Sequence, residues 1–208
     1  VLNLIHGRDG EDGKIAGIMQ FFEIKTITPN IEASVISYNK LLTKLYAKQI
    51  GVSVLDYNYL KKGEGIDYKQ IKFPIIIKPI RLGSSIGVSI AKNKEEFNYA
   101  LDVAFEFDDE VIVEPFIEGI NEYNLAGCRV SQDKIEFSNV EQVSKNQFLS
   151  YDDKYCDFSR KELQQNNCPT ILERRIKENF EKIYNTLFNG ALIRCDFFEL
   201  DGVIYLNE

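Results

Sequence analysis

The sequence predicts an α+β fold whose sheets are mostly antiparallel. Strand-like apolar runs and helix-periodic segments mix along the 208 residues without an internal repeat. A glycine–serine loop joins two of these runs, and the last two runs predict a hairpin. A chain of this length holds one large domain or two small ones.

The first 70 residues predict one strand and two helices. Residues 1–5 are apolar and predict a buried strand, which the turn-rich residues 6–13 end. Helical spacing predicts a short helix within residues 15–22 and a longer, unbroken one within residues 29–51. An exposed loop is expected over residues 61–70. In the longer helix, helical spacing is kept by Ile31, Val35, Tyr38, Leu42 and Leu45.

The rest of the chain predicts six strands and two helices. Asn93 and Glu96 form a capping-box pattern that opens one helix, and residues 169–190 predict the other, between a proline and a glycine. Asp201 and Gly202 supply the turn of the closing hairpin. Strands are expected at residues 73–80, 86–91, 111–114, 123–130, 191–200 and 203–207.

Composition excludes several classes of function. Lys and Arg number 25 against 32 Asp and Glu, and this formal charge of -7 argues against a nucleic-acid partner. No apolar run approaches the roughly 20 residues that span a bilayer, so no membrane partner is expected. The four cysteines form no CxxC pair, and one histidine cannot complete a zinc site with them. We therefore expect a soluble cytoplasmic protein with reduced, structural thiols.

The segment FPIIIKPIRLGSSIG, residues 73–87, carries the strongest local signal. Lys78 lies in an otherwise apolar strand, where a charge is costly unless it meets a partner. The loop that follows contains Gly83, Ser84 and Ser85, whose N–H groups and hydroxyls suit an anion. The segment is neither a Walker A loop nor a Rossmann fingerprint, because a strand follows it. Taken alone, it fits a phosphate clamp and a glycine hairpin with a snorkelling lysine about equally.

A second cluster lies in the closing hairpin. Arg194 and Asp196 alternate with apolar residues and so share one face of a strand. Glu208 ends the partner strand and can approach Asp196 on that face. Two carboxylates beside an arginine suit Mg²⁺ ions that hold a polyphosphate, although a solvated sheet face carries such charges too. The presence of Lys78 and the glycine–serine loop in the same chain favours an ATP-dependent enzyme.

The whole chain resembles D-alanine–D-alanine ligases of the ATP-grasp superfamily. The resemblance rests on five segments in the family's order: HGRDGEDG, FPIIIKPIRLGSSIGVSI, EVIVEPFIEGINEYNLAG, DDKY and IRCDFFELDGVIYLNE. It implies an ATP-grasp fold with a central domain at residues 40–117 and a C-terminal domain at residues 118–208. Residues 1–39 resemble a remnant of an α/β N-terminal domain, so we expect a fragment that lacks most of that domain and the C-terminal end.

The resemblance also implies a reaction. Two D-alanines are joined to D-alanyl-D-alanine through an acyl phosphate, with ATP and Mg²⁺ (or Mn²⁺), for peptidoglycan precursor synthesis. The intact enzyme is expected to be a homodimer in the cytoplasm, and the fragment's oligomeric state stays open. The fragment alone is expected to be inactive.

Site roles follow from matching positions within the family. Lys40 and Lys78 match the lysines that hold the α- and β-phosphates, and Glu122 matches the ribose ligand, although its segment is one residue longer than usual. Asp196 and Glu208 match Mg²⁺ ligands. The remaining nucleotide positions are Gly83 and Ser85 in the flap, Glu114, Pro115 and Ile117 at the adenine hinge, and Lys154 near the γ-phosphate.

Four further positions match catalytic residues. Ser84 orders the substrate site, Tyr155 closes the loop over the γ-phosphate, and Arg194 steadies the oxyanion of the tetrahedral intermediate. His6 matches a histidine near the first D-alanine, although it could instead cap the following helix. Tyr155 favours the dipeptide over D-alanyl-D-lactate. The alternatives are another ATP-grasp carboxylate–amine or D-Ala–D-lactate ligase, and a non-catalytic nucleotide-binding module.

Overall fold

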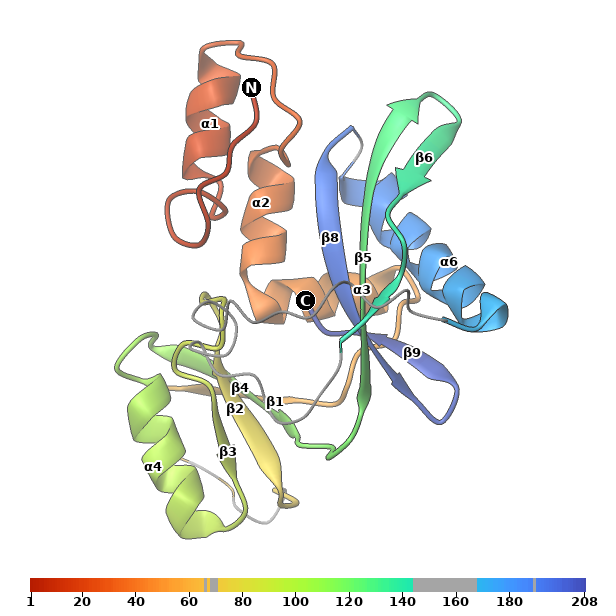
Figure 1. The fold of residues 1–208 in the computed structure, drawn as a ribbon. Helices are drawn as coiled ribbons and strands as arrows, with labels where there is room; N and C mark the ends of the chain where they lie inside the picture. Colours follow the sequence, from red (N-terminus) through yellow and green to blue (C-terminus); the bar gives the residue numbers. More distant parts are fainter. Residues whose placement is uncertain (66, 68–70, 144–167, 189) are drawn as a thin grey trace, which may run out of the picture.

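The computed structural model describes residues 1–65, 67, 71–143, 168–188 and 190–208. Two antiparallel sheets, each covered by a helix, form the body of the molecule, and an N-terminal segment of short helices lies against them (Figure 1). The predicted α+β class is therefore confirmed. Among the described residues, no helix has both the length and the apolar character to cross a membrane.

The smaller sheet has the order β1-β4-β2-β3, and helix α4 covers one of its faces. Its core contains Ile75, Ile77, Val111 and Val113 with Phe97 and Leu101 of the helix. The predicted helix start is confirmed, because the side chain of Asn93 accepts a hydrogen bond from the N–H of Glu96 at 2.9 Å. The elements are β1 (Asn58–Lys61), β2 (Ile75–Pro79), β3 (Ser89–Ala91), α4 (Lys94–Ala104) and β4 (Glu110–Pro115).

The larger sheet has the order β6-β5-β8-β9, with β7 paired to β5. Helix α6 (Thr170–Leu187) packs Ile176, Phe180, Ile183 and Tyr184 into its core. The elements are β5 (Asn121–Ser131), β6 (Lys134–Phe137), β7 (Glu141–Gln142), β8 (Leu192–Leu200) and β9 (Val203–Leu206). The predicted hairpin at the end of the chain is confirmed, with Leu200 opposite Val203. Sequence reasoning did not predict β1, β6 or β7.

The prediction of a strand at residues 1–5 is wrong. This segment has no regular secondary structure, and its apolar side chains are exposed. The side-chain oxygen of Asn3 accepts a hydrogen bond from the N–H of Ile5 at 3.0 Å. A local turn of this kind competes with strand pairing, and apolar character alone cannot supply a partner strand.

The predicted unbroken helix within residues 29–51 is also wrong. The chain forms α2 (Ile31–Tyr38) and α3 (Lys40–Gln49), which follow the short helix α1 (Lys14–Phe21). Asn39 separates α2 from α3 because its backbone is extended and its side chain caps α3, accepting hydrogen bonds from the N–H groups of Leu41 and Leu42.

Helix α3 connects the two sheets. At its start, the N–H of Lys40 donates to the carbonyl of Ile80, just after β2, at 2.9 Å. Further along, the Tyr46 hydroxyl donates to the carbonyl of Ile183 in α6 at 3.1 Å. Ala47 belongs to the core of the larger sheet. Helix α3 therefore packs on the C-terminal half, whereas the boundaries of the domains at residues 40–117 and 118–208 stay predictions.

Candidate functional site

Side chains alternate between the two faces of the smaller sheet, and one of these faces carries charged residues. Because Ile77 points toward α4, the side chains of Lys78 and Glu114 lie on the opposite face. In the β2–β4 register, Ile76 is paired with Glu114 and Ile112 with Lys78. Lys78 and Glu114 are thus diagonal neighbours on one face, within reach of long side chains.

Glu114 is the centre of a buried charge cluster. Its side chain is only 1% exposed, and its two carboxylate oxygens face two ammonium groups. The Nζ atom of Lys78 lies 2.6 Å from Oε2, and Lys44 of α3 forms an ion pair with Oε1. Burial alone would raise the pKa of Glu114, but the charges of Lys78 and Lys44 outweigh it and lower this pKa. Glu114 is therefore a stable anion.

Lys78 reaches from this cluster toward the end of the chain. Its side chain is 12% exposed, and its ammonium donates to the Oδ1 atom of Asn207 at 3.2 Å. It also lies 6.0 Å from the centre of the Phe198 ring. The alternative of a snorkelling lysine is therefore wrong, because the ammonium meets protein groups at the junction of the two sheets.

Lys40 lies at the same junction. Its ammonium is 2.7 Å from a carboxylate oxygen of Glu208 and also donates to the carbonyl of Leu82. Glu208 in turn lies beside Asp196, whose N–H donates to the Glu208 carbonyl at 2.8 Å. The C-terminus thus lies close to α3, between the two sheets (Figure 1). The structure brings together four charged residues that the sequence predicted: Lys40, Lys78, Asp196 and Glu208.

The glycine–serine loop begins at this cluster, since Lys40 binds the carbonyl of Leu82. Ser84 and Ser85 have φ values of 57° and 59°, a left-handed conformation that costs energy for residues with a Cβ atom. Gly87 is also left-handed, and a Cβ there would come within 2.8 Å of the Phe107 ring. Loops that hold such strained conformations are common at ligand sites.

The larger sheet contributes a second polar face. Arg194 and Asp196 point away from the core that Cys195 occupies. Asp196 is paired with Asn124 across the sheet, and Glu122 lies on the same face, two residues before Asn124. Arg194 binds both carboxylate oxygens of Asp196, at 2.8 and 3.0 Å. Burial raises the pKa of Asp196, although Arg194 opposes this shift.

This face partly fits the expected divalent cation. Asp196 is a nearly buried carboxylate, and the Oδ1 atom of Asn124 opposite it is buried, with no hydrogen-bond partner among the residues that the structure describes. An amide oxygen and two carboxylates, those of Asp196 and Glu208, are ligands that Mg²⁺ accepts. Within the described residues, no group of three or more Asp, Glu, His or Cys side chains could hold a metal. Phosphate oxygens would therefore have to complete the coordination, and Arg194 would have to release Asp196.

Several predicted residues lie elsewhere. The His6 side chain is 85% exposed, with its Nδ1 atom 3.7 Å from Glu11. It does not cap α1, because Gly13 precedes that helix without a side-chain cap. Pro115 ends β4 and Ile117 follows it, at the connection between the two sheets. Lys154 and Tyr155 lie outside the described residues.

Sequence reasoning missed Lys44 and Asn207. It followed the helical spacing of Leu42 and Leu45, but both of these side chains are exposed. The buried face of α3 is instead made by Lys40, Thr43, Lys44 and Ala47. Their spacing of three and four residues places them on one helix face, and this was a usable signal for a shared buried surface. Hydrophobicity concealed it, because two of these buried side chains are charged: Lys44 pairs with Glu114 and Lys40 with Glu208.

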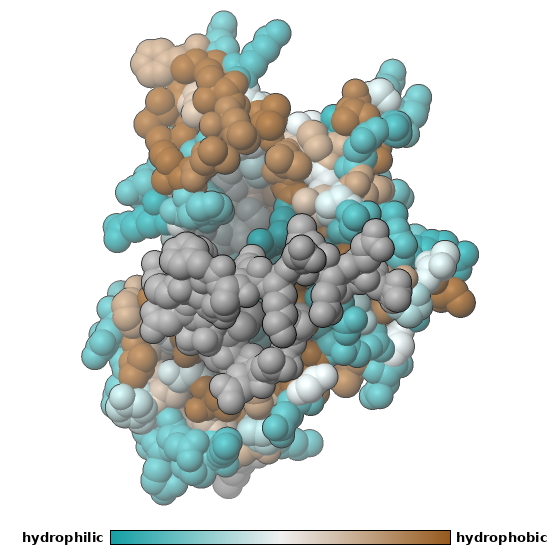
Figure 2. Space-filling view, in the orientation of Figure 1, coloured by the Kyte–Doolittle hydropathy of each residue, from teal (hydrophilic) through white to brown (hydrophobic). Residues whose placement is uncertain are grey.

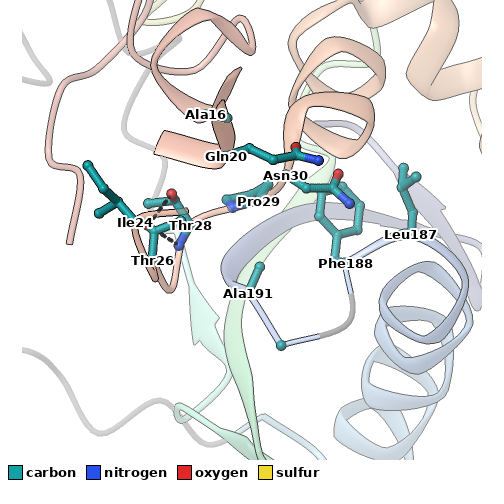
Figure 3. Close-up of a pocket in the computed structure, with 11 residues that line it drawn as sticks. Ala16, Gln20, Ile24, Thr26, Thr28, Pro29, Asn30, Leu187, Phe188 and Ala191 are labelled. Carbon is teal, nitrogen blue, oxygen red and sulfur yellow. Dashed lines mark hydrogen bonds between the residues drawn. The ribbon is translucent and has the colours of Figure 1, made fainter. Parts of the chain in front are cut away.

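A cavity beside the N-terminal segment is separate from this site. A cavity of about 290 Å³ lies between the α1–α2 connection and the end of α6 (Figure 3). Thr26, Thr28, Asn30 and Phe188 are among the residues that line it. None of the predicted nucleotide, metal or substrate residues that the structure describes lines this cavity.

Comparison with known proteins identifies the family. The family model of the D-ala D-ala ligase C-terminus matches residues 46–208. A D-alanine–D-alanine ligase of Campylobacter jejuni (subsp. jejuni serotype O:23/36, strain 81-176) is 56% identical over 209 residues, which cover the whole chain and 60% of that protein. The chain therefore belongs to the D-alanine–D-alanine ligase family, and it spans about 60% of the length of the curated relatives it matches.

Solved structures agree with this assignment. The crystal structure of a D-alanine–D-alanine ligase from Helicobacter pylori superimposes with a TM-score of 0.87 at 46% identity, covering the whole chain and 61% of that protein. The VanG D-Ala:D-Ser ligase of Enterococcus faecalis gives 0.82 at 26% identity, covering the whole chain and 62% of that protein. The two sheets are those of the predicted ATP-grasp fold.

Proposed function

We propose that the protein to which these residues belong joins two D-alanines to D-alanyl-D-alanine in an ATP-dependent reaction that supplies peptidoglycan precursors. The observation that carries this proposal is the convergence of Lys40 and Lys78 on the segment of Asp196 and Glu208 at the junction of the sheets. Membership of the ligase family supports the choice of reaction.

The residues suit a two-step ligation. In the first step, the carboxylate of one D-alanine attacks the γ-phosphate of ATP, which gives an acyl phosphate and ADP. In the second, the amine of another D-alanine attacks the acyl carbon, and inorganic phosphate leaves. Lys40 and Lys78 hold the phosphates by charge, and Arg194 stabilises the oxyanion of the tetrahedral intermediate.

A divalent cation belongs to this proposal. Asp196 and Glu208 would hold Mg²⁺ or Mn²⁺, with Asn124 close to Asp196 on the same sheet face. When bound, the ion neutralises phosphate charge. Arg194 would then move from Asp196 toward the reacting groups, which would couple the two roles proposed for these residues.

The remaining assignments are proposals from the family pattern. Adenine binds at Glu114, Pro115 and Ile117, and chiefly at backbone groups, because the Glu114 carboxylate already faces two lysines. Glu122 binds ribose, and the loop residues Gly83, Ser84 and Ser85 close over the phosphates. His6 lies near the first D-alanine, and Lys154 and Tyr155 close over the γ-phosphate.

A cytoplasmic homodimer is the proposed state of the intact enzyme. Apolar side chains gather on the surface of the N-terminal segment, at the top of Figure 2. They include Val1, Leu4, Phe21 and Phe22, which are all more than half exposed. An apolar surface of this kind is typical of a region that another part of the protein or a second subunit covers.

Calorimetric titration of this chain with ADP and Mg²⁺ tests the nucleotide site. We expect saturable binding, and Lys78→Met should weaken it at least about tenfold, because an opposite charge close to a phosphate is lost. Lys92→Met is the matched control, since Lys92 is exposed and no described contact ties its side chain to the site. The absence of binding, or an equal effect of both variants, would contradict the proposed site.

Product analysis tests the reaction. The gene product that contains these residues is incubated with ATP, D-alanine and, in turn, D-serine or D-lactate, and the products are identified by mass spectrometry. D-alanyl-D-alanine as the main product supports the proposal. A dominant D-Ala–D-Ser or D-Ala–D-lactate product would favour another ligase of the family, and nucleotide binding without ligation would favour a non-catalytic module.

A further inference from the structure

Lys44 has no part in the proposed steps, yet it lies directly behind the proposed nucleotide site. It is in the second turn of α3, and its side chain is only 2% exposed. Burial lowers the pKa of Lys44, and the nearby carboxylate of Glu114 opposes this shift. An ammonium so fully removed from water is costly unless it has a charged partner, and here the partner is Glu114.

The charges of the cluster do not cancel. Two ammonium groups, on Lys44 and Lys78, share the single carboxylate of Glu114, which leaves one positive charge in excess. Water cannot solvate the charge of Glu114, because its side chain is buried. If Lys44 lost its charge, Glu114 would therefore be neutralised by Lys78 alone, and the cluster would have no net charge.

The excess charge lies at the open end of the cluster. Of the two lysines, Lys78 is the more exposed and reaches Asn207 at the junction of the sheets. Lys44 is enclosed on the other side of the carboxylate and lies 5.7 Å from the centre of the Tyr57 ring. An anion that approaches the junction would thus meet the Lys78 ammonium, with Lys44 shielded behind Glu114.

We propose that Lys44 is a positioning residue that shares in neutralising Glu114 from its buried side, so that the Lys78 ammonium keeps excess positive charge with which to hold a nucleotide phosphate. The inference rests on the proposed nucleotide site. A purely structural lysine would stabilise the fold but would not change affinity through Glu114.

A double-mutant cycle on this chain tests the inference. The variants are Lys44→Met, Glu114→Gln and the double variant, each titrated with ADP and Mg²⁺ by calorimetry. Lys44→Met should weaken binding at least about tenfold, because Lys78 must then neutralise Glu114 alone. In the Glu114→Gln background, the same change should have less than about a threefold effect, because no carboxylate remains to occupy Lys78.

Lys48→Met is the matched control. Lys48 lies one turn further along α3, is exposed, and lies over the Tyr57 ring at 4.7 Å. The Lys48→Met substitution removes a lysine charge from the same helix without affecting a contact of Glu114, so ADP binding should stay within about twofold of the parent chain. Circular dichroism of each variant checks that the fold is retained. If Lys44→Met does not fold, the comparison of Glu114→Gln with the double variant still tests whether Lys44 acts when the carboxylate is absent.

The outcomes separate the two proposals. If the parent chain does not bind ADP, the proposed nucleotide site is wrong, and the inference about Lys44 falls with it. If the parent chain binds ADP but Lys44→Met binds equally well, only the role of Lys44 is overturned. The role of Lys44 would also be overturned if Lys44→Met weakened ADP binding equally in the parent chain and in the Glu114→Gln variant. Lys44 would then act on the nucleotide without Glu114.

Discussion

Replacing Tyr184 by Phe removes a hydroxyl that connects α6 to both central strands of the larger sheet. The hydroxyl donates to the carbonyl of Ala191, just before β8, at 2.6 Å and accepts from the N–H of Arg129 in β5 at 2.8 Å. The ring would stay in place, because it stacks on Phe180 with a centroid distance of 5.6 Å. Tyr184→Phe therefore deletes two hydrogen bonds and leaves the packing of the ring intact.

The loss can be calculated from these contacts. Each buried hydrogen bond contributes about 0.5–1.5 kcal/mol net, so the free energy of unfolding should fall by about 2 kcal/mol. For a protein of this size that corresponds to a decrease in Tm of about 4–8 °C. Thermal unfolding followed by circular dichroism measures the shift, with Tyr99→Phe as the control because the Tyr99 side chain is exposed. A Tm for Tyr184→Phe within about 1 °C of the parent chain would refute the reasoning.

Two further predictions concern the same core. Gly127→Ala would bring a Cβ within 2.8 Å of the Phe180 ring, and this overpacking should lower the free energy of unfolding by about 1–3 kcal/mol in urea titrations. Gly65→Ala, which has open space around it, is the control, and equal midpoints for the two variants would contradict the prediction. Burial raises the pKa of the Cys195 thiol far above its ordinary value, so iodoacetamide at pH 8 should leave Cys195 unmodified until the chain unfolds. Mass spectrometry of the labelled native chain checks this, and rapid modification of Cys195 would show that β8 opens.

Much of the candidate site could be predicted because its signals are local. A lysine in an apolar strand, as at Lys78, must have a partner or a ligand. The alternation around Asp196 correctly placed it with Arg194 on a face outside the core. The roles of these residues toward a nucleotide stay predictions, but the structure does bring Lys78 and the segment of Asp196 to one junction.

Other parts of the site could not be predicted, because they depend on contacts between distant segments. Nothing near Lys44 in the sequence indicates that it meets a carboxylate 70 positions later, at Glu114. Asn39 caps α3, and within this helix Lys44 meets that carboxylate while Leu45 is exposed, against the hydrophobic pattern. Apolar periodicity predicts burial only where apolar side chains make the contact, whereas the buried face of α3 includes Lys44, whose charge meets Glu114.

The sequence by itself determined the α+β class, the strands β2, β3, β4, β5, β8 and β9, the helices α4 and α6, and the shared strand face of Arg194 and Asp196. Those features follow from periodicity, turns and caps, which act over a few residues. Only the tertiary structure decided that α3 lies between the sheets and that Lys40 meets Glu208. It also decided that Lys44 and Lys78 share Glu114. These pairings are decided by how the two halves pack, and the energy of a buried charge depends on the partner that this packing provides.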